Sequence, residues 1–113
     1  MNIASKNNSE HYNWGESCEG WHLLKSEGFS IIEELVPPGS KEQRHYHNSA
    51  QQFFYVLSGE ANLEVSGVKH LLRTGQGFHV SPKEPHQLSN TSSEALEFLV
   101  ISQPMSHGDR VDA

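Results

Sequence analysis

The chain has 113 residues, which is enough for one compact domain and too few for two. Fourteen acidic residues against eight basic ones give a net charge of −6, so the chain lacks the basic surface that nucleic acids and anionic membranes attract. The longest apolar run is the five residues 53–57, far below the roughly 20 that cross a bilayer, and residues 1–20 contain no apolar leader, so we expect a cytoplasmic protein.

Residues 1–28 are rich in Asn, Ser, Glu and Gly, and they predict an irregular N-terminal arm whose tryptophans pack onto the main body. Residues 29–103 contain short segments rich in β-branched and aromatic residues, separated by turns of Gly, Pro, Ser and Asn. These segments predict strands at 29–36, 52–57, 61–65, 68–72, 78–80, 86–89 and 96–102. Residues 104–113 are expected to form a polar tail. The pattern is typical of an all-β domain, an antiparallel β-barrel or jelly roll.

Histidine is the unusual residue of this composition, with eight copies. His45 and His47 are two positions apart on an extended segment, so both imidazoles point to the same side, roughly 7 Å apart at the backbone, and could converge on one ion. Gln52 shares its parity with Phe54 and Val56, which we expect to face the core. Taken alone, an H-x-H pair is equally compatible with surface histidines or with core histidines that bind no ion.

Two longer spacings connect these histidines with residues further along the chain. The first runs through Gly39, His45, His47, Gln52 and Gly59, and the second through Gly75, Ser81, Lys83, His86 and Asn90. Both match the two sequence motifs of cupins, so the chain resembles a single-domain cupin over roughly residues 29–101. It departs from the family pattern at three positions, with Gln52 in place of glutamate, Ser81 in place of proline and Lys83 in place of glycine.

The resemblance implies one divalent metal ion inside the barrel, bound by His45, His47, His86 and Gln52. Zn, Fe, Ni, Mn or Cu would suit such ligands. Three imidazoles and one amide leave the ion its full positive charge, which favours polarising a substrate oxygen over redox cycling. Two alternatives remain open: Gln52 could pack beside the ion while water completes a three-histidine set, or the site could be degenerate and empty.

Three further residues are candidates for the chemistry around the ion. His79 could line the pocket or support a ligand, or it could face solvent. Asp109 could act as a general base and Arg110 could bind an anionic substrate if the C-terminal tail folds over the mouth of the barrel. The alternative for this tail, which includes His107, is a disordered polar terminus.

These observations predict a metal-dependent isomerase or lyase that acts on a small oxygen-rich metabolite such as a sugar acid. The alternatives are a metal-dependent dioxygenase and a non-catalytic cupin that binds a small molecule. Edge strands and the apolar residues of the N-terminal arm indicate a homodimer. Neither nucleic acid nor a membrane is expected as a partner.

Overall fold

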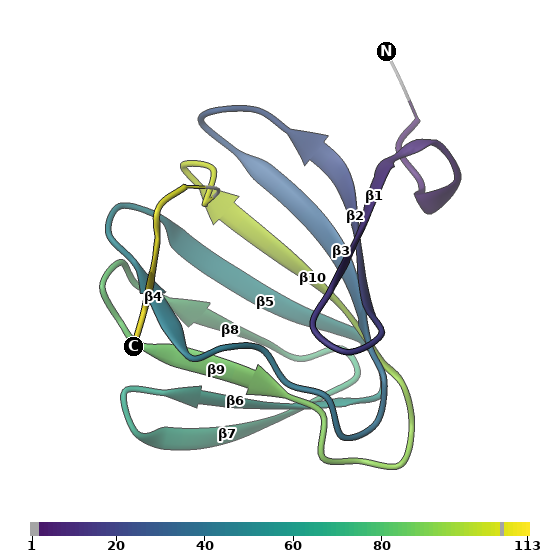
Figure 1. Ribbon diagram of the computed structural model, residues 1–113, viewed down its shortest axis with the longest axis vertical. Helices are drawn as coiled ribbons and strands as arrows, with labels where there is room; N and C mark the ends of the chain where they lie inside the picture. The colour runs from purple at the N-terminus through teal and green to yellow at the C-terminus, as the bar shows by residue number, and fades with distance from the viewer. Residues whose placement is uncertain (1–2, 107) are drawn as a thin grey trace.

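The computed structural model describes residues 3–106 and 108–113 and confirms the predicted all-β class (Figure 1). The helical part of these residues is the short 3-10 turn η1 (Lys6–Asn8), and no described helix is long and apolar enough to span a bilayer. The strands are β1 (Glu10–Trp14), β2 (Cys18–Lys25), β3 (Ser30–Val36), β4 (His45–His47), β5 (Gln51–Ser58), β6 (Glu60–Val65), β7 (Val68–Arg73), β8 (Gly77–Val80), β9 (His86–Ser89), β10 (Leu96–Gln103) and β11 (Arg110–Asp112).

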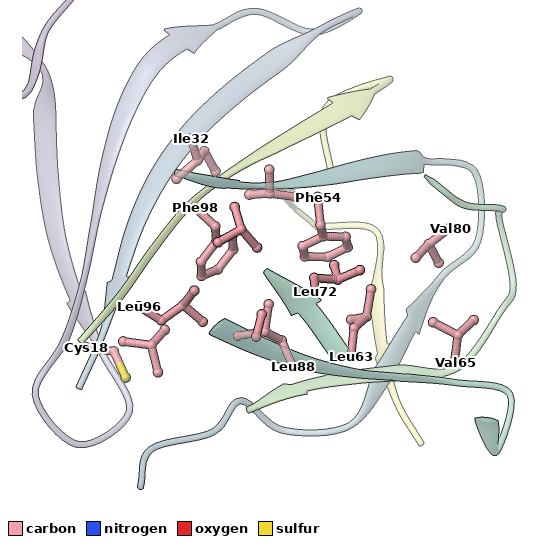
Figure 2. Close-up of a cluster of buried hydrophobic side chains, with 14 residues drawn as sticks. Cys18, Ile32, Phe54, Leu63, Val65, Leu72, Val80, Leu88, Leu96 and Phe98 are labelled. Atoms are coloured by element: carbon pink, nitrogen blue, oxygen red, sulfur yellow. The ribbon is translucent and has the colours of Figure 1, made fainter. Parts of the chain in front are cut away.

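The strands form two antiparallel sheets with the hydrophobic core between them (Figures 1 and 2). The larger sheet has the order β1-β2-β3-β10-β5-β8, and the smaller has the order β11-β4-β9-β6-β7. Both orders bring together strands that are distant in sequence, such as β3 with β10 and β4 with β9. This arrangement is the two-sheet jelly roll that the strand spacing predicts.

Alternating burial along the central strands explains why the sequence folds this way. On β5, Gln52, Phe54 and Val56 are buried while their neighbours are exposed, as their parity predicts. The buried residues of β10 alternate in the same way, and Phe98 packs against Phe54 with ring centroids 6.1 Å apart. Each central strand therefore presents one apolar face to the opposite sheet and one mixed face to the outside.

The N-terminal segment contains more regular structure than its polar composition predicts. Strand β2 pairs along β3, and β1 pairs with β2 in continuous register, so both strands extend the larger sheet. Backbone hydrogen bonds to the exposed edge of β3 do not depend on apolar side chains, which is why composition alone underestimates this segment. Trp14 packs against the core as expected, whereas Trp21 lies under the ammonium group of Lys6, 4.6 Å from the ring centre.

The buried Asn90 fixes the connection between β9 and β10. Its Nδ2 donates to the backbone oxygens of Val36 and Glu94 at 2.9 and 2.7 Å, and its Oδ1 accepts from the backbone N and the hydroxyl of Ser92 at 3.0 and 2.8 Å. One buried amide therefore joins the end of β3 to the loop before β10 and satisfies polar groups of both.

We expect Asn90→Ala to lower the free energy of unfolding by about 3 kcal/mol, because truncation leaves buried backbone groups without partners. Chemical denaturation followed by tryptophan fluorescence measures this value. The matched control is Asn13→Ala on the exposed side of β1, for which we expect a change below about 0.5 kcal/mol. Equal effects of the two substitutions would contradict the assigned role of Asn90.

Candidate metal centre and its cavity

Three histidines from two neighbouring strands converge inside the molecule. His45 and His47 project from the same face of β4, and His86 begins β9, where it pairs directly with His45. One ring nitrogen from each residue lies within 4.8 Å of those of the other two, and all three side chains are buried. The inward parity predicted for His45 and His47 is therefore what brings them to His86.

Backbone carbonyls orient two of these rings. His45 Nδ1 donates to the Gln43 carbonyl at 2.7 Å, and His86 Nδ1 donates to the Glu84 carbonyl at 2.9 Å. In a neutral imidazole this leaves Nε2 as the unprotonated nitrogen, with its lone pair free to bind a cation. Carbonyl contacts of this kind are the usual way in which proteins orient histidine ligands.

Gln52 also turns an acceptor atom toward the interior. Its Nε2 donates to the hydroxyl of Ser102 on β10 at 3.1 Å, which identifies Oε1 as the atom available for a further contact. Within the described part of the chain, Gln52 Oε1, His47 Nδ1 and His86 Nε2 are buried and have no hydrogen-bond partner. Buried polar atoms without partners are costly, so this set of neutral donors fits a metal ion.

Burial keeps the three imidazoles neutral. Desolvation is the largest cause in each case, and it lowers the pKa of His45 to about 3 and that of His47 to about 4. The pKa of His86 is lowered for the same reason. Neutral imidazole is the form that binds metals, so the cluster is ready for a cation at neutral pH.

A loop between β8 and β9 places His86 and also supports β4. Lys83, which stands where the family pattern has glycine, adopts a left-handed backbone with φ of 68°. Its backbone N donates to the carbonyl of His47 at 2.6 Å, so the same turn contacts one histidine strand and leads into the other. The left-handed conformation explains why glycine suits this position, and the lysine accepts a backbone strain of about 1 kcal/mol.

A cavity of about 460 Å³ opens beside the histidines. Its wall includes His45, His47 and Gln52, together with the apolar side chains of Ile32, Phe54 and Val100 and the polar side chains of Tyr12, Glu34, Glu42 and Arg110. A volume of this size suits a small metabolite, and the mixture of apolar wall and few polar groups is typical of ligand sites.

The other three candidate residues, His79, Asp109 and Arg110, lie in three different environments. His79 is exposed on β8 and contacts Gln51 at 2.8 Å, away from the lining of the cavity. Asp109 contacts backbone: its Oδ2 accepts from the amides of Ser49 and Ala50, both at 2.9 Å, and these bonds lower the pKa of its carboxyl. Arg110 belongs to the cavity wall.

The C-terminal residues form strand β11, which adds to the histidine strand instead of ending in a polar tail. Arg110 pairs with His47 and Asp112 with His45 in antiparallel register. The reason is local, because the carboxylate of Asp109 binds two backbone amides in the turn that follows β4. His107 lies outside the described residues.

Three residues of the cavity wall escaped the sequence analysis. Glu34 and Glu42 are partly buried carboxylic acids, and Tyr12 donates from its hydroxyl to Glu34 Oε2 at 2.8 Å. The sequence did carry a signal for Glu34, because it shares its parity on β3 with the buried Ile32 and Val36. Glu42 lies outside any strand, so no parity rule could identify it.

Comparisons with known proteins agree with this architecture. The sequence model of the family described as Cupin domain matches residues 32–102. The uncharacterized protein MJ1618 of Methanocaldococcus jannaschii is 32% identical over 89 residues, which cover 78% of this chain and 71% of that protein. An L-ectoine synthase of Wolinella succinogenes is 31% identical over 93 residues, which cover 80% of this chain and 70% of that protein. The structure of KdgF from Halomonas sp. superposes with a TM-score of 0.85 at 14% identity, and the superposition covers 95% of this chain and 96% of that protein.

We expect Asp109→Ala to release β11 from the turn after β4. Loss of the two amide contacts should raise hydrogen exchange at Ser49, Ala50 and the β11 amides by about tenfold, measured by NMR. Asp112→Ala is the matched control, since the exposed Asp112 side chain contacts only its strand neighbour Arg110 among the described residues. Unchanged protection in the Asp109 variant would show that backbone pairing alone holds the strand.

Proposed function

The chain belongs to the cupin domain family, and on this premise we propose that it is a metal-dependent enzyme that isomerises or cleaves a small oxygen-rich metabolite. The observation that carries the proposal is the cluster of the buried, neutral histidines His45, His47 and His86. Two of these, His45 and His47, line a cavity that Gln52 also lines. A divalent ion bound there would act as a Lewis acid that polarises a substrate oxygen and acidifies neighbouring protons.

The chain's own residues would select and orient the substrate. Ile32, Phe54 and Val100 exclude water from one part of the cavity, which strengthens electrostatic interactions inside it. Arg110 contributes a guanidinium group to the cavity wall, and its Nη2 donates to the Gln43 carbonyl at 3.3 Å. We propose that Arg110 pairs with a carboxylate or another anionic group of the substrate, which would favour acids over neutral sugars.

The relatives support an enzyme more than a binding module. An L-ectoine synthase matches most of the chain at 31% identity, and by its name it catalyses a reaction. The likeness to KdgF concerns the fold. The predicted homodimer stays a prediction; Phe53, Tyr55 and Leu57 on the outer face of β5 are 37–39% exposed and offer an apolar surface for it.

A substrate screen on the purified protein tests the proposal. Metal content is measured first, and the loaded protein is then offered hydroxy acids, keto acids and sugar acids with and without oxygen. Turnover that is independent of oxygen supports the proposed chemistry. Oxygen uptake would replace it with a dioxygenase, and saturable binding without turnover would replace it with a binding protein.

The histidine cluster is tested by removing one of its donors. His47→Ala removes one donor, and we expect the affinity for zinc to fall by at least about 100-fold. Competition with a chromogenic chelator, together with elemental analysis, measures this loss. His79→Ala is the matched control, because this exposed histidine lies outside the cavity, and it should keep native affinity. Equal affinities of both variants would contradict the assigned site.

The role of the Gln52 amide is tested by replacing it with a carboxylate. Gln52→Glu should keep the metal and lower turnover by roughly tenfold or more, because a carboxylate cancels one unit of positive charge on the ion and weakens its action on the substrate. Gln51→Glu, on the exposed side of the same strand, is the control. Native kinetics in a metal-loaded Gln52→Glu protein would show that the neutral donor has no role in the reaction.

A further inference from the structure

Two carboxylic acids share the cavity with the histidine cluster, and the donor set uses neither of them. Glu34 lies on β3 among residues that face the core, and Glu42 lies in the segment that leads into β4. Both line the same cavity as His45 and His47. Acidic side chains turned toward an interior cavity are costly to bury, so they point to a chemical role.

Glu34 is positioned by a row of three residues across neighbouring strands. Tyr12 pairs with Gly20, and Gly20 pairs with Glu34. A Cβ atom at position 20 would lie 2.2 Å from Cζ of Tyr12, so only glycine leaves space for the tyrosine ring. The ring crosses β2 at this point, and the Tyr12 hydroxyl donates to Glu34 Oε2 at 2.8 Å. A hydroxyl that donates to a carboxyl oxygen stabilises the ionised form of Glu34.

Glu42 is held from the other sheet. Its Oε2 accepts from the backbone N of Leu88 at 2.9 Å, and its own backbone N donates to the Leu88 carbonyl at 3.1 Å. Leu88 follows His86 on β9, so Glu42 is fixed relative to the strand that carries one of the histidines. The two acids therefore reach one cavity from opposite sheets.

The two acids differ in how easily they ionise. Burial raises the pKa of Glu34 to about 7, although the contact with Tyr12 and the charge of Arg110 act in the opposite direction. Burial, followed by the charge of Glu34, raises the pKa of Glu42 to about 8. The Tyr12 hydroxyl favours the ionised form of Glu34, and the charge of Glu34 favours the protonated form of Glu42, so Glu34 is the acid that ionises first.

We propose that Glu34 and Glu42 are the proton-transfer pair of the cavity, with Glu34 as the base and Glu42 as the acid. This inference rests on the proposed function for the position of the substrate. Glu34 removes a proton from a carbon or hydroxyl of the substrate, and Glu42 delivers its proton to a second substrate atom. The electron pair of the broken bond forms a new double bond within the substrate, and the electron pair of an adjacent carbonyl double bond takes up the proton from Glu42. The double bond is thereby relocated, Glu34 ends protonated and Glu42 ionised, and the substrate is isomerised with no net oxidation or reduction.

The first test uses metal-free protein and follows the glutamate carboxyl carbons by NMR as the pH changes. Among the described residues, the charged or titratable groups around the pair are Tyr12 from β1, Cys18 from β2, Lys41 next to Glu42, His45 and His47 from β4, and Arg110 from β11. In Glu34→Gln the titration midpoint of Glu42 should fall by about one pH unit, because the neighbouring negative charge is gone. In Tyr12→Phe the midpoint of Glu34 should rise. Independent midpoints near the ordinary value in the native protein would overturn the pair.

The second test separates the two roles in zinc-loaded protein. Pyruvate in heavy water is the probe, and loss of its methyl proton signal reports proton removal. Glu34→Gln removes the base and should slow this exchange by about 100-fold or more, whereas Glu42→Gln removes only the proton donor and should slow it less, by about tenfold. Glu33→Gln, on the opposite face of β3, is the control.

The outcomes of the second test distinguish the pair from the metal site. If native protein does not exchange the probe, or if Glu34→Gln exchanges it at the native rate, the proton-transfer pair is overturned. In either case the metal site of the proposed function is tested separately, by the zinc affinity and metal content of His47→Ala.

Discussion

The alternation of side chains along a strand is the constraint on which the site depends. Residues 45, 47, 52 and 86 come from three strands in two sheets, and each has the parity that points inward. A shift of one residue in any of these strands would turn its donor to the outside and bring an outward-facing neighbour in its place. The register of β10 on β5 adds to this constraint, because it sets Ser102 opposite Gln52 and so orients the amide.

Desolvation acts on the histidines and on the glutamates of the cavity in opposite senses. It disfavours charge, so it lowers the pKa of His45 and His47 and raises the pKa of Glu34 and Glu42. The result is a cavity whose imidazoles are neutral and whose carboxylic acids ionise less readily than free glutamate. One physical cause therefore acts both on the proposed metal ligands and on the proposed proton-transfer pair.

Much of this site could be read from the sequence, because short-range rules determine it. Parity predicted that His45 and His47 point to the same side and that Gln52 faces the core, and motif spacing connected them with His86. The other half depends on contacts between distant segments: the row through Gly20 needs the register of three strands, and β11 forms because Asp109 meets the turn after β4. Composition described both termini as polar, but it carries no information on which backbone edges they pair with.

The neutral amide of Gln52 adds no charge to the cavity, whereas Glu34 and Glu42 add two ionisable carboxyl groups to its wall. A carboxylate within the donor set would be held ionised by a bound cation and would be unable to exchange protons at neutral pH. With a neutral amide in that place, Glu34 and Glu42 are the carboxylic acids among the described residues that line the cavity. An ion bound by neutral donors would keep its full charge, so under the proposed function the group that polarises the substrate and the groups that transfer protons are separate parts of one cavity.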